Sequence, residues 1–394
     1  MKPAIATETS QSKLKGCATP RLLILTAGFG EGHNAAARNL ALAGDALHGP
    51  GTTQAIDLFA LASPRLNQIS RRAYLAAING APGLWSRFYH WVDHHEVFPK
   101  HLWLMRKELR LLDELIQRER PAVICSTFPA YGFLFERLAA TGRLTAPFFN
   151  VVTDSISINS LWVRPACTGW FVPNEDTAEA MRTAGVPADR LHVLGFPVPS
   201  FFSEQARDLA PPDLTAGAAP RVLYIVHSGV RHAWETARSL LEQSDLELTF
   251  AVGRDKRLRH RLEKLAAGRR QFTEILGWTN EVPRLLMTHH VVISKAGGAT
   301  TQEAIAARCP MLVNQVVPGQ EEGNYQLLLR HRVGALVETP EAVVGTLRQA
   351  FANQGALWQE WRKSLVPLAR PDASRDIVNQ LFSAAPRSPI IASA

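Results

Sequence analysis

Residues 22–43 read LLILTAGFGEGHNAAARNLALA. The unbroken apolar run at Leu22–Leu25 is typical of a strand that is buried on both faces of a parallel sheet. An alanine-rich stretch follows and predicts a helix. Three glycines, Gly28, Gly30 and Gly32, lie between the two. Strand, glycine loop and helix in this order form the place where open α/β sheets bind phosphate-bearing ligands. The stretch therefore predicts a doubly wound α/β domain.

One hypothesis for this loop is a dinucleotide cradle. That motif requires Gly-x-Gly-x-x-Gly and an acidic residue near the end of the next strand, and Asp57 lies at about that place. However, His33 stands where the motif requires glycine or alanine, and Gly32 is an extra glycine. A histidine at the start of a helix suits hydrogen bonding or proton transfer. His33 is therefore a candidate catalytic residue, and a dinucleotide-dependent oxidoreductase stays open as an alternative.

Length and composition indicate a soluble protein of two domains. The chain has 394 residues, of which 46% are hydrophobic, and its mean hydropathy is −0.05. It holds no apolar run of the roughly 18 residues that a membrane-spanning helix needs, and residues 1–20 lack the apolar core of a signal peptide. We therefore expect a cytoplasmic protein. Its net charge of +8 favours polyanionic partners, whether nucleic acid, an anionic membrane or phosphorylated substrates.

Short apolar runs alternate with helical stretches through both halves of the chain, which predicts parallel sheets wrapped by helices. The stretch SEQARDLAPPDLTAGAAP, residues 203–220, interrupts this pattern and is typical of a linker. We therefore predict an α/β protein of two Rossmann-like, doubly wound domains that face a cleft. The expected parts are a disordered N-terminus (1–20), an N-terminal domain (21–202), the linker (203–220), a C-terminal domain (221–365), a helix that packs back toward the N-terminal domain (366–384) and a disordered tail (385–394).

Residues 65–110 mix aromatic and basic side chains. The candidate contacts include the aromatics Trp85, Phe88, Tyr89 and Trp91 and the cations Arg71 and Arg72. Aromatic rings prefer the lipid–water boundary and cations are attracted to anionic headgroups, so the segment suits a surface that lies on a bilayer without spanning it. Two other hypotheses are that the aromatics pack into the domain core, or that they stack on single-stranded nucleic acid.

The stretch ISKAGGATTQEAIAARCPMLVNQVVPGQEEGNYQLLL, residues 293–329, is the most informative part of the second half. An apolar strand ends at Ser294, and Gly297 and Gly298 open a helix. Free amide groups at such a helix start stabilise a diphosphate without a metal ion. The side chains that could contribute to a nucleotide-sugar site are the hydroxyls of Thr300 and Thr301, the carboxylate of Glu303, and the polar cluster of Gln320, Glu321 and Asn324 after the next strand. Trp278 could form a wall of the base pocket or belong to the core.

These motifs resemble the GT-B glycosyltransferases, and among them the group that contains the monogalactosyldiacylglycerol synthases, the processive diacylglycerol glucosyltransferases and the lipid II-forming transferase. LTAGFGEGHNAAARNLA is similar to the group's N-terminal glycine and histidine loop, and residues 57–89 resemble its aromatic-rich acceptor segment. Further landmarks follow in order, namely VVTDSISINSLW, GVPADRLHVLGFPVPSFF and LGWTNEVPRLL. The resemblance runs from about Arg21 to about Gly334.

The resemblance implies transfer of a hexose from a UDP-sugar to diacylglycerol or a similar lipid. The donor would bind to the C-terminal domain, and the lipid hydroxyl would approach the N-terminal domain. Carried over residue by residue, Gly297, Gly298, Thr300 and Thr301 would face the diphosphate, Glu303 the ribose, and Gln320, Glu321 and Asn324 the sugar. His33 or Asp154 would act as the base, with Gly30 and Gly32 on the acceptor side.

No metal or other cofactor is implied, and nucleic acid is not an expected partner. The neighbouring histidines His94–His95 and His289–His290 do not suggest a metal site, because adjacent residues on a helix do not face one ligand position. The enzyme would be peripheral on the cytoplasmic face of the cell membrane, held there by its anionic surface.

The chain departs from the family pattern in HSGVRHAW, residues 227–234, where relatives have a glycine-rich turn. Only Gly229 remains, so we expect phosphate contacts there from the side chains of Ser228 and Arg231. A different lipid acceptor, or an inactive homologue that binds UDP-sugar or lipid, are the alternatives that this departure leaves open.

Overall fold

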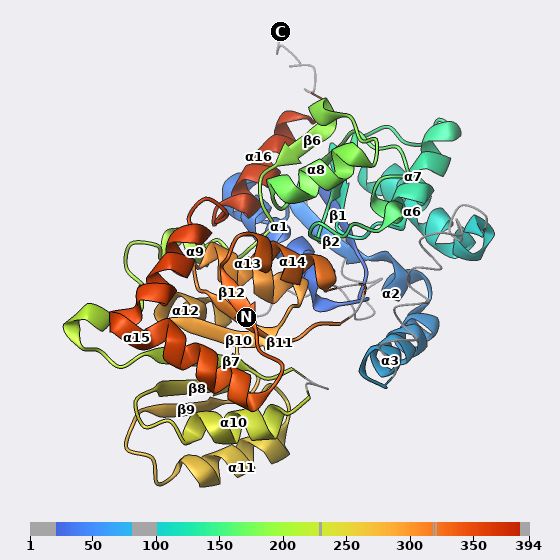
Figure 1. Cartoon of the computed structure of the whole chain (residues 1–394). Coiled ribbons are helices and arrows are strands. Elements are labelled where there is room, and N and C mark those ends of the chain that lie inside the picture. Colours follow the sequence, from blue (N-terminus) through green and yellow to red (C-terminus); the bar gives the residue numbers. More distant parts are fainter. Residues whose placement is uncertain (1–20, 81–100, 228–230, 318, 320, 387–394) are drawn as a thin grey trace. The chain divides into compact units, whose positions relative to one another are not determined.

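The computed structural model describes residues 21–80, 101–227, 231–317, 319 and 321–386 (Figure 1). Contacts divide them into two units. The first holds the described residues up to Thr153, then Ile158–Pro197, then those from Asp372 onward. The second holds Asp154–Ser157 and Val198–Pro371, so the stretch 203–220 lies within it. Each unit is built around one parallel sheet of six strands.

The first sheet has the strand order β2-β1-β3-β4-β5-β6. Its strands are β1 (Leu22–Thr26), β2 (Thr53–Asp57), β3 (Val123–Ser126), β4 (Phe148–Val151), β5 (Gly169–Val172) and β6 (Leu191–Val193). The α-helices of this unit are α1 (Glu31–His48), α2 (Leu58–Ala62), α3 (Pro64–Gly80), α6 (Arg106–Glu119), α7 (Tyr131–Ala140), α8 (Glu175–Thr183) and α16 (Ala373–Ser383). Short 3₁₀ turns are η1 (Leu102–Met105), η2 (Ser160–Trp162) and η3 (Ala188–Arg190).

The second sheet has the order β12-β11-β10-β7-β8-β9. Its strands are β7 (Arg221–Ile225), β8 (Glu247–Ala251), β9 (Thr273–Leu276), β10 (Val291–Lys295), β11 (Met311–Gln315) and β12 (Gly334–Leu336). Its helices are α9 (Phe201–Glu204), η4 (Leu214–Ala216), α10 (Ala233–Leu241), α11 (Lys256–Ala266), α12 (Val282–Thr288), α13 (Gly298–Ala306), α14 (Glu322–Arg330) and α15 (Pro340–Leu365). The last is two helices joined by a kink, because Ala352–Gly355 have non-helical backbone angles.

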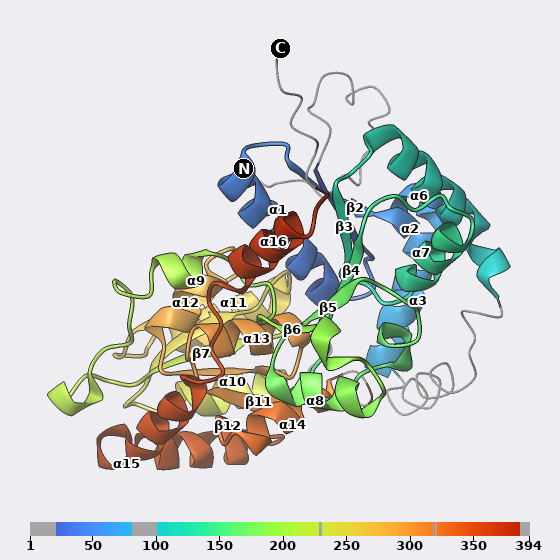
Figure 2. The same ribbon diagram turned by 90° about the horizontal axis from the view of Figure 1, so that it is seen from above.

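Strand β1 shows why the sequence at residues 22–25 is an unbroken apolar run. Successive side chains of a strand point to opposite faces. Leu22 and Ile24 pack with α1 and α16, whereas Leu23 and Leu25 pack with α6 and α7. Both faces are covered, and all four side chains are completely buried. Helix α16 lies beside α1 in this unit (Figure 2).

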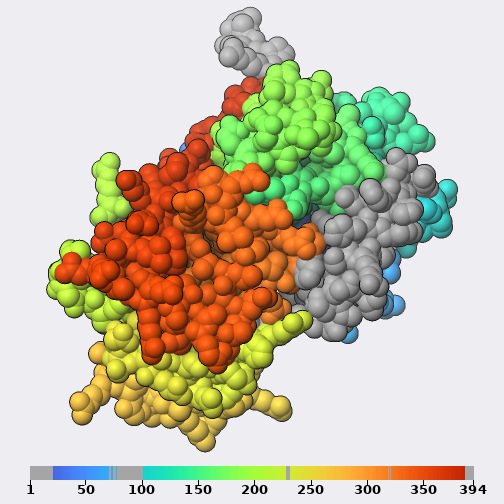
Figure 3. Space-filling model, in the orientation of Figure 1, coloured from blue at the N-terminus to red at the C-terminus, as the bar shows by residue number. Residues whose placement is uncertain are grey.

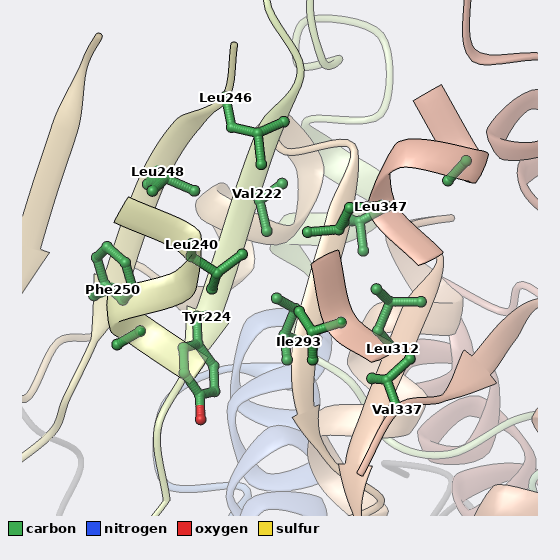
Figure 4. Close-up of a cluster of buried hydrophobic side chains, with 14 of the residues drawn as sticks. Val222, Tyr224, Leu240, Leu246, Leu248, Phe250, Ile293, Leu312, Val337 and Leu347 are labelled. Atoms are coloured by element: carbon green, nitrogen blue, oxygen red, sulfur yellow. The ribbon is translucent and has the colours of Figure 1, made fainter. Parts of the chain in front are cut away.

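The second unit has a comparable core on the face of its sheet that α10, α11 and α15 cover. Val222 and Tyr224 of β7 pack there against Leu240 of α10, and Leu312 of β11 packs in the same cluster as Leu347 of α15 (Figure 4). Helices α12 and α13 lie on the other face (Figure 1). The two covered faces account for the apolar strand sequences of this unit as well.

Strand order locates the place in each sheet where a ligand would bind. The chain runs outward from β1 in both directions, and β1 and β3 are neighbours. In the second sheet the same reversal lies between β7 and β10. Open α/β sheets bind ligands outside the carboxyl ends of the strands at such a switch point. A ligand is therefore expected at the loops after β1 and β3, and after β7 and β10.

Candidate functional site

His33 lies at the switch point of the first sheet. It belongs to the first turn of α1, directly behind the loop that follows β1. Its Nδ1 atom lies 2.6 Å from the carbonyl oxygen of Thr127 and 2.9 Å from the hydroxyl of Thr153. Thr127 follows β3 and Thr153 follows β4, so three neighbouring strand ends meet at this imidazole. The edge of the ring also packs against Phe128, with the ring centroids 5.2 Å apart.

These contacts assign the proton on the imidazole of His33. A carbonyl oxygen can only accept a hydrogen bond, so Nδ1 carries the proton and donates it to Thr127. In the neutral ring Nε2 is then the basic nitrogen. Thr127 also donates from its own hydroxyl to the carbonyl oxygen of His33, at 3.0 Å. The imidazole is thus oriented as a proton acceptor through Nε2.

The surroundings of this loop do not support the dinucleotide cradle. Asp57, the acid that would hold a ribose, is only 3% exposed. Its carboxylate accepts the backbone N–H of Ala60 and caps α2. Gly30 precedes α1 with φ at 112°, a conformation that favours glycine. The glycine is explained by this backbone turn at the entry to α1.

Asp154 directly follows Thr153 in sequence and is half-buried. It opens the short segment Asp154–Ser157, which groups by its contacts with the second unit. In this segment the Ser155 hydroxyl accepts a hydrogen bond from Nε2 of Gln302, at 3.0 Å. A Cβ atom at Gly323 would lie 1.7 Å from the Ser155 carbonyl oxygen, so only glycine fits there. Sequence reasoning did not identify these contacts of the segment.

In the second unit α13 begins at Gly298, with Gly297 as the preceding cap residue, as the glycine pair predicts. No side chain caps the helix start. Gly298 and Thr300 are partly exposed there, and Glu303 lies one turn later, half-buried. Thr301 differs from our expectation, because it is fully buried and its hydroxyl lies 3.8 Å from the sulfur of Met311. Adjacent residues on a helix point about 100° apart, so Thr300 and Thr301 do not share one face.

Lys295, at the end of β10, contacts residues from both parts of the expected donor motif. Its ammonium forms an ion pair with the buried carboxylate of Glu321, at the start of α14. The other carboxylate oxygen of Glu321 accepts the backbone N–H of Val317, at 3.1 Å. Both Lys295 and Glu321 lie against Gly297. The motif residues around 297 and 321 are therefore neighbours, and Lys295 places a cation beside them that sequence reasoning missed.

Asn324 closes the same cluster. Its amide nitrogen donates to the carbonyl oxygen of Ala296, at 3.0 Å. Its Oδ1 atom is buried and has no hydrogen-bond donor among the residues that the structure describes. An unpaired buried carbonyl oxygen costs free energy, which a ligand hydroxyl would recover. This oxygen is thus a candidate ligand contact beside the start of α13.

His227, in the loop after β7, completes the switch point of the second sheet. Its Nε2 atom lies 2.9 Å from the hydroxyl of Ser294, near the end of β10. Burial, together with the charge of Lys295, lowers the pKa of His227 to about 4. The imidazole is therefore neutral at physiological pH. Farther along the loop, the backbone N–H of Arg231 donates to the side chain of Gln315, at 2.9 Å.

Trp278 lies apart from this cluster. It follows β9 and its side chain is 55% exposed. Three strand spacings separate β9 from β10, which is about 14 Å across the sheet. A cavity of about 260 Å³ lies at the amino ends of the strands, and Arg221 and Glu247, the first residues of β7 and β8, line it. It is at the amino ends, away from the switch point, and we do not assign it to the site.

Several predicted site residues lie outside the described residues, namely Ser228, Gly229, Gln320, Trp85, Phe88, Tyr89 and Trp91, as does the side chain of Arg71. Of the same aromatic and basic segment, Arg72 is described and exposed. Large apolar side chains are also exposed in this part of the first unit. They are Leu61 of α2, Leu66 and Ile69 of α3, and Trp103 and Leu104 of η1. Within the described ranges, no helix has the length and apolarity that crossing a membrane requires.

The residues that the structure describes contain no group of three or more histidine, cysteine or acidic side chains that could hold a metal ion. His289 and His290 lie between α12 and β10, and each ring bonds different partners. His289 contacts the Leu285 carbonyl oxygen and the Thr249 hydroxyl. His290 accepts the backbone N–H of Arg221 and contacts the Pro212 carbonyl oxygen. These contacts explain the pair as structural.

Comparison with known proteins covers both units. Residues 33–198 match the family model of monogalactosyldiacylglycerol (MGDG) synthase. The chain is 25% identical, over 92% of its length and 93% of the relative, to the processive diacylglycerol β-glucosyltransferase of Bacillus cytotoxicus. It is equally similar to the enzyme of the same name from Bacillus cereus, over 92% of this chain and 94% of the relative. The resemblance inferred from the motifs is confirmed.

Solved structures confirm the GT-B fold. MurG of Acinetobacter baumannii superimposes with a TM-score of 0.61 at 14% identity, over 92% of this chain and all of that one. UDP-GlcNAc 2-epimerase from Neisseria meningitidis, solved with UDP-GlcNAc bound, gives a TM-score of 0.56 at 14% identity, over 92% and 99% of the two chains. MurG and an epimerase thus share this architecture, so the fold alone does not determine the function.

Proposed function

We propose that this protein transfers a hexose from a UDP-sugar to diacylglycerol. The proposal takes the chain as a GT-B glycosyltransferase that is similar to the monogalactosyldiacylglycerol synthases and the processive diacylglycerol glucosyltransferases. The product would be a monoglycosyldiacylglycerol. The observation that carries the proposal is the similarity to diacylglycerol glucosyltransferases over 92% of the chain, which includes both units. A fold match alone would support only the architecture.

The donor would bind at the switch point of the second sheet. Backbone N–H groups at the start of α13 would donate hydrogen bonds to the diphosphate, together with the hydroxyl of Thr300. Lys295 adds a positive charge beside the same residues. Glu303 would bind the ribose, and the sugar would be bound by Gln320, Glu321 and Asn324. The unpaired Oδ1 of Asn324 would accept a hydrogen bond from a sugar hydroxyl. Because cationic and amide groups stabilise the leaving diphosphate, the proposed reaction needs no metal ion.

The acceptor would be activated by His33 or Asp154. In the first case, Nε2 of His33 takes the proton of the lipid hydroxyl while the hydroxyl oxygen forms a bond to the anomeric carbon of the sugar. The bond from that carbon to the diphosphate oxygen breaks, and UDP leaves with the electron pair. A general base of this kind contributes roughly a factor of 10² to 10⁴ to the rate. The hydrogen bond from Nδ1 to Thr127 supports this role, since it keeps the lone pair on Nε2.

The first unit would also hold the enzyme at the cytoplasmic face of the cell membrane, as a peripheral protein. Leu66 and Ile69 of α3 are each 63% exposed, and Arg72 lies on the same helix. Trp103 and Leu104 of η1 are 58% and 63% exposed. Exposed apolar side chains together with cations suit a surface that enters the headgroup layer of an anionic bilayer. The lipid acceptor would then reach the enzyme without crossing water.

The test is to incubate the purified protein with diacylglycerol vesicles and, in parallel, UDP-glucose, UDP-galactose and UDP-N-acetylglucosamine, followed by mass spectrometry of the lipids. We expect one monoglycosyldiacylglycerol from a UDP-hexose, formed equally well with a chelator present. Absence of any glycolipid with all three donors would contradict the proposal. Tight binding of UDP without a product would instead favour a binding homologue or a different lipid acceptor.

A further inference from the structure

Helix α11 and its flanks in the second unit carry an unusual excess of exposed positive charge. Between residues 254 and 270, seven arginine and lysine side chains are exposed, against two acidic ones. The exposed cations are Arg254, Lys256, Arg257, Arg259, Arg261, Lys264 and Arg270, and the acids are Asp255 and Glu263. In Figure 3 the gold atoms of this part of the chain form the lower rim of the second unit. We call Lys256, Arg257, His260 and Lys264 the α11 basic face.

The body of the protein holds this helix in a fixed orientation. Leu258 and Leu262 are buried against the sheet, and Leu262 is completely inaccessible. The guanidinium of Arg261 lies 3.6 Å from the ring centroid of Trp234. Asp255 accepts the backbone N–H groups of residues 257 and 258 and so caps the helix. Because residues four apart lie above one another on a helix, Lys256, His260 and Lys264 project together on the side opposite to this anchor.

Stability of the helix does not explain these charges. Lys256 and Arg257 are its first two residues. The N-terminal end of a helix carries a partial positive charge, so cations there are unfavourable. Among the described contacts on α11, a single ion pair offsets the charge, between Arg259 and Glu263 at 2.9 Å. The arrangement costs the isolated protein free energy that a polyanionic partner would return.

Large apolar side chains are exposed at both ends of the helix. Leu265 in its last turn is 43% exposed, and Phe272, shortly after it, is 59% exposed. Near the first turn, Arg259 lies against Gly277, next to Trp278, which is 55% exposed. Cations on one face, with apolar and aromatic groups at its margins, are the pattern of a surface that lies on a lipid headgroup layer. Bases of a nucleic acid would instead need aromatic rings interleaved with the cations.

We infer that the α11 basic face is a docking surface of the second unit for an anionic lipid bilayer. The occupant is a layer of negatively charged headgroups, chosen by charge complementarity. This choice rests on the proposed function, because the proposed lipid acceptor is itself embedded in a bilayer. The surface is separate from the exposed apolar side chains of α2, α3 and η1, which belong to the first unit.

The test compares two triple variants of the full chain that lose the same charge. The first, K256Q/R257Q/K264Q, removes three cations of the α11 basic face, and glutamine forms helices about as well as lysine or arginine. The control, R207Q/K363Q/R370Q, removes three exposed cations elsewhere in the same unit. Binding is measured by sedimentation with vesicles of phosphatidylcholine, with or without phosphatidylglycerol, and without any UDP-sugar. Thermal unfolding of each variant checks that it folds.

We expect the α11 variant to bind phosphatidylglycerol vesicles about tenfold or more weakly than the native protein, since each basic residue near an anionic surface contributes to binding. The control variant should bind within about twofold of the native protein, because its three substituted cations are not part of the α11 basic face. Glycolipid formation in uncharged detergent micelles should be equal for all three proteins. That last assay fails for every protein if the proposed function is wrong, whereas vesicle binding does not depend on it.

Three results would overturn the inference. The first is that the native protein binds vesicles equally well with and without phosphatidylglycerol. The second is that the α11 variant binds as well as the native protein. The third is that both variants lose vesicle binding equally, which would show an effect of net charge alone. Binding of a single-stranded RNA at physiological salt that the α11 variant loses, with vesicle binding intact, would assign the surface to nucleic acid instead.

Discussion

Each unit places a histidine at the switch point of its sheet, and the two histidines are in different electrostatic surroundings. His33 follows β1 and donates from Nδ1 to a backbone carbonyl oxygen. His227 follows β7, contacts the hydroxyl of Ser294 and lies near Lys295, whose charge contributes to its lowered pKa. The first arrangement orients a basic nitrogen. The second keeps an imidazole neutral beside a cation, where an anion would bind.

The comparison shows how one architecture can supply two kinds of chemistry. Strand order fixes where a ligand meets each sheet, but the side chains at the strand ends decide what happens there. Around His33 these are the carbonyl oxygen of Thr127 and the hydroxyl of Thr153, which orient the ring. Around His227 they include an ammonium group and the start of α13, which attract negative charge. We therefore expect substitutions in the two units to impair different steps.

The largest effect is expected from His33→Ala. Without the proposed base, the rate of glycolipid formation should fall about 10²- to 10⁴-fold at saturating UDP-sugar. The rate is measured from the lipid product at several enzyme concentrations. His227→Asn serves as the matched control, since it removes the imidazole of the other unit. If both variants lost the same factor in rate, and the UDP-sugar concentration needed for saturation did not change, the claim that the two histidines have different roles would be wrong.

A smaller effect is expected from Lys295→Met on the affinity for UDP. Hydrogen bonds to charged groups contribute about 1.5–3 kcal/mol, so the Kd for UDP should rise roughly 10- to 100-fold. Titration calorimetry measures it. The substitution also leaves the buried carboxylate of Glu321 without its cation, and K295M/E321Q removes that defect. If the double variant recovers native affinity, Lys295 acts only by supporting Glu321 and does not bind the diphosphate.

The smallest effect per group is on stability in mild acid, and it concerns the neutral imidazoles of the second unit. Burial lowers the pKa of His289 and His290 to about 4, as it does for His227. An unfolded histidine has a pKa of about 6.5. Between pH 6.5 and 4 the unfolded chain therefore binds protons that the folded protein does not. The free energy of unfolding should fall with decreasing pH, by at most about 1.4 kcal/mol per pH unit for each imidazole.

Urea unfolding at a series of pH values from 7 to 5 measures this slope. His227→Asn removes one of the three groups, so the slope should become shallower. A stability that stays constant or rises as the pH falls through this range would show that these imidazoles are not held neutral in the folded protein.

Much of the fold could be predicted from the sequence. The apolar runs after Arg21 and Arg221 form the first strand of each sheet, because strands covered on both faces need unbroken apolar sequences. The glycine pair 297–298 marks the start of α13, as the motif predicts. Such signals are local, and local signals are readable without a structure.

The contacts that orient the site could not be predicted, because they join distant parts of the chain. Thr127 and Thr153 lie 94 and 120 residues after His33. Nothing in the sequence distinguishes these two threonines from the other threonines that follow apolar runs. Lys295 stands inside the quoted motif, yet its pairing with Glu321, 26 residues later, appears only once β10 and β11 are neighbours. Thr301 could have been excluded, since a helix does not direct two successive side chains to one ligand.

The central claim, that His33 serves the acceptor while the second unit binds the nucleotide, is tested most directly by titrating the His33→Ala variant with UDP in a calorimeter. We expect the Kd for UDP to stay within about twofold of the native value, because the proposed nucleotide contacts lie on the other unit. A loss of tenfold or more in UDP affinity would place the nucleotide at the first loop and contradict this account.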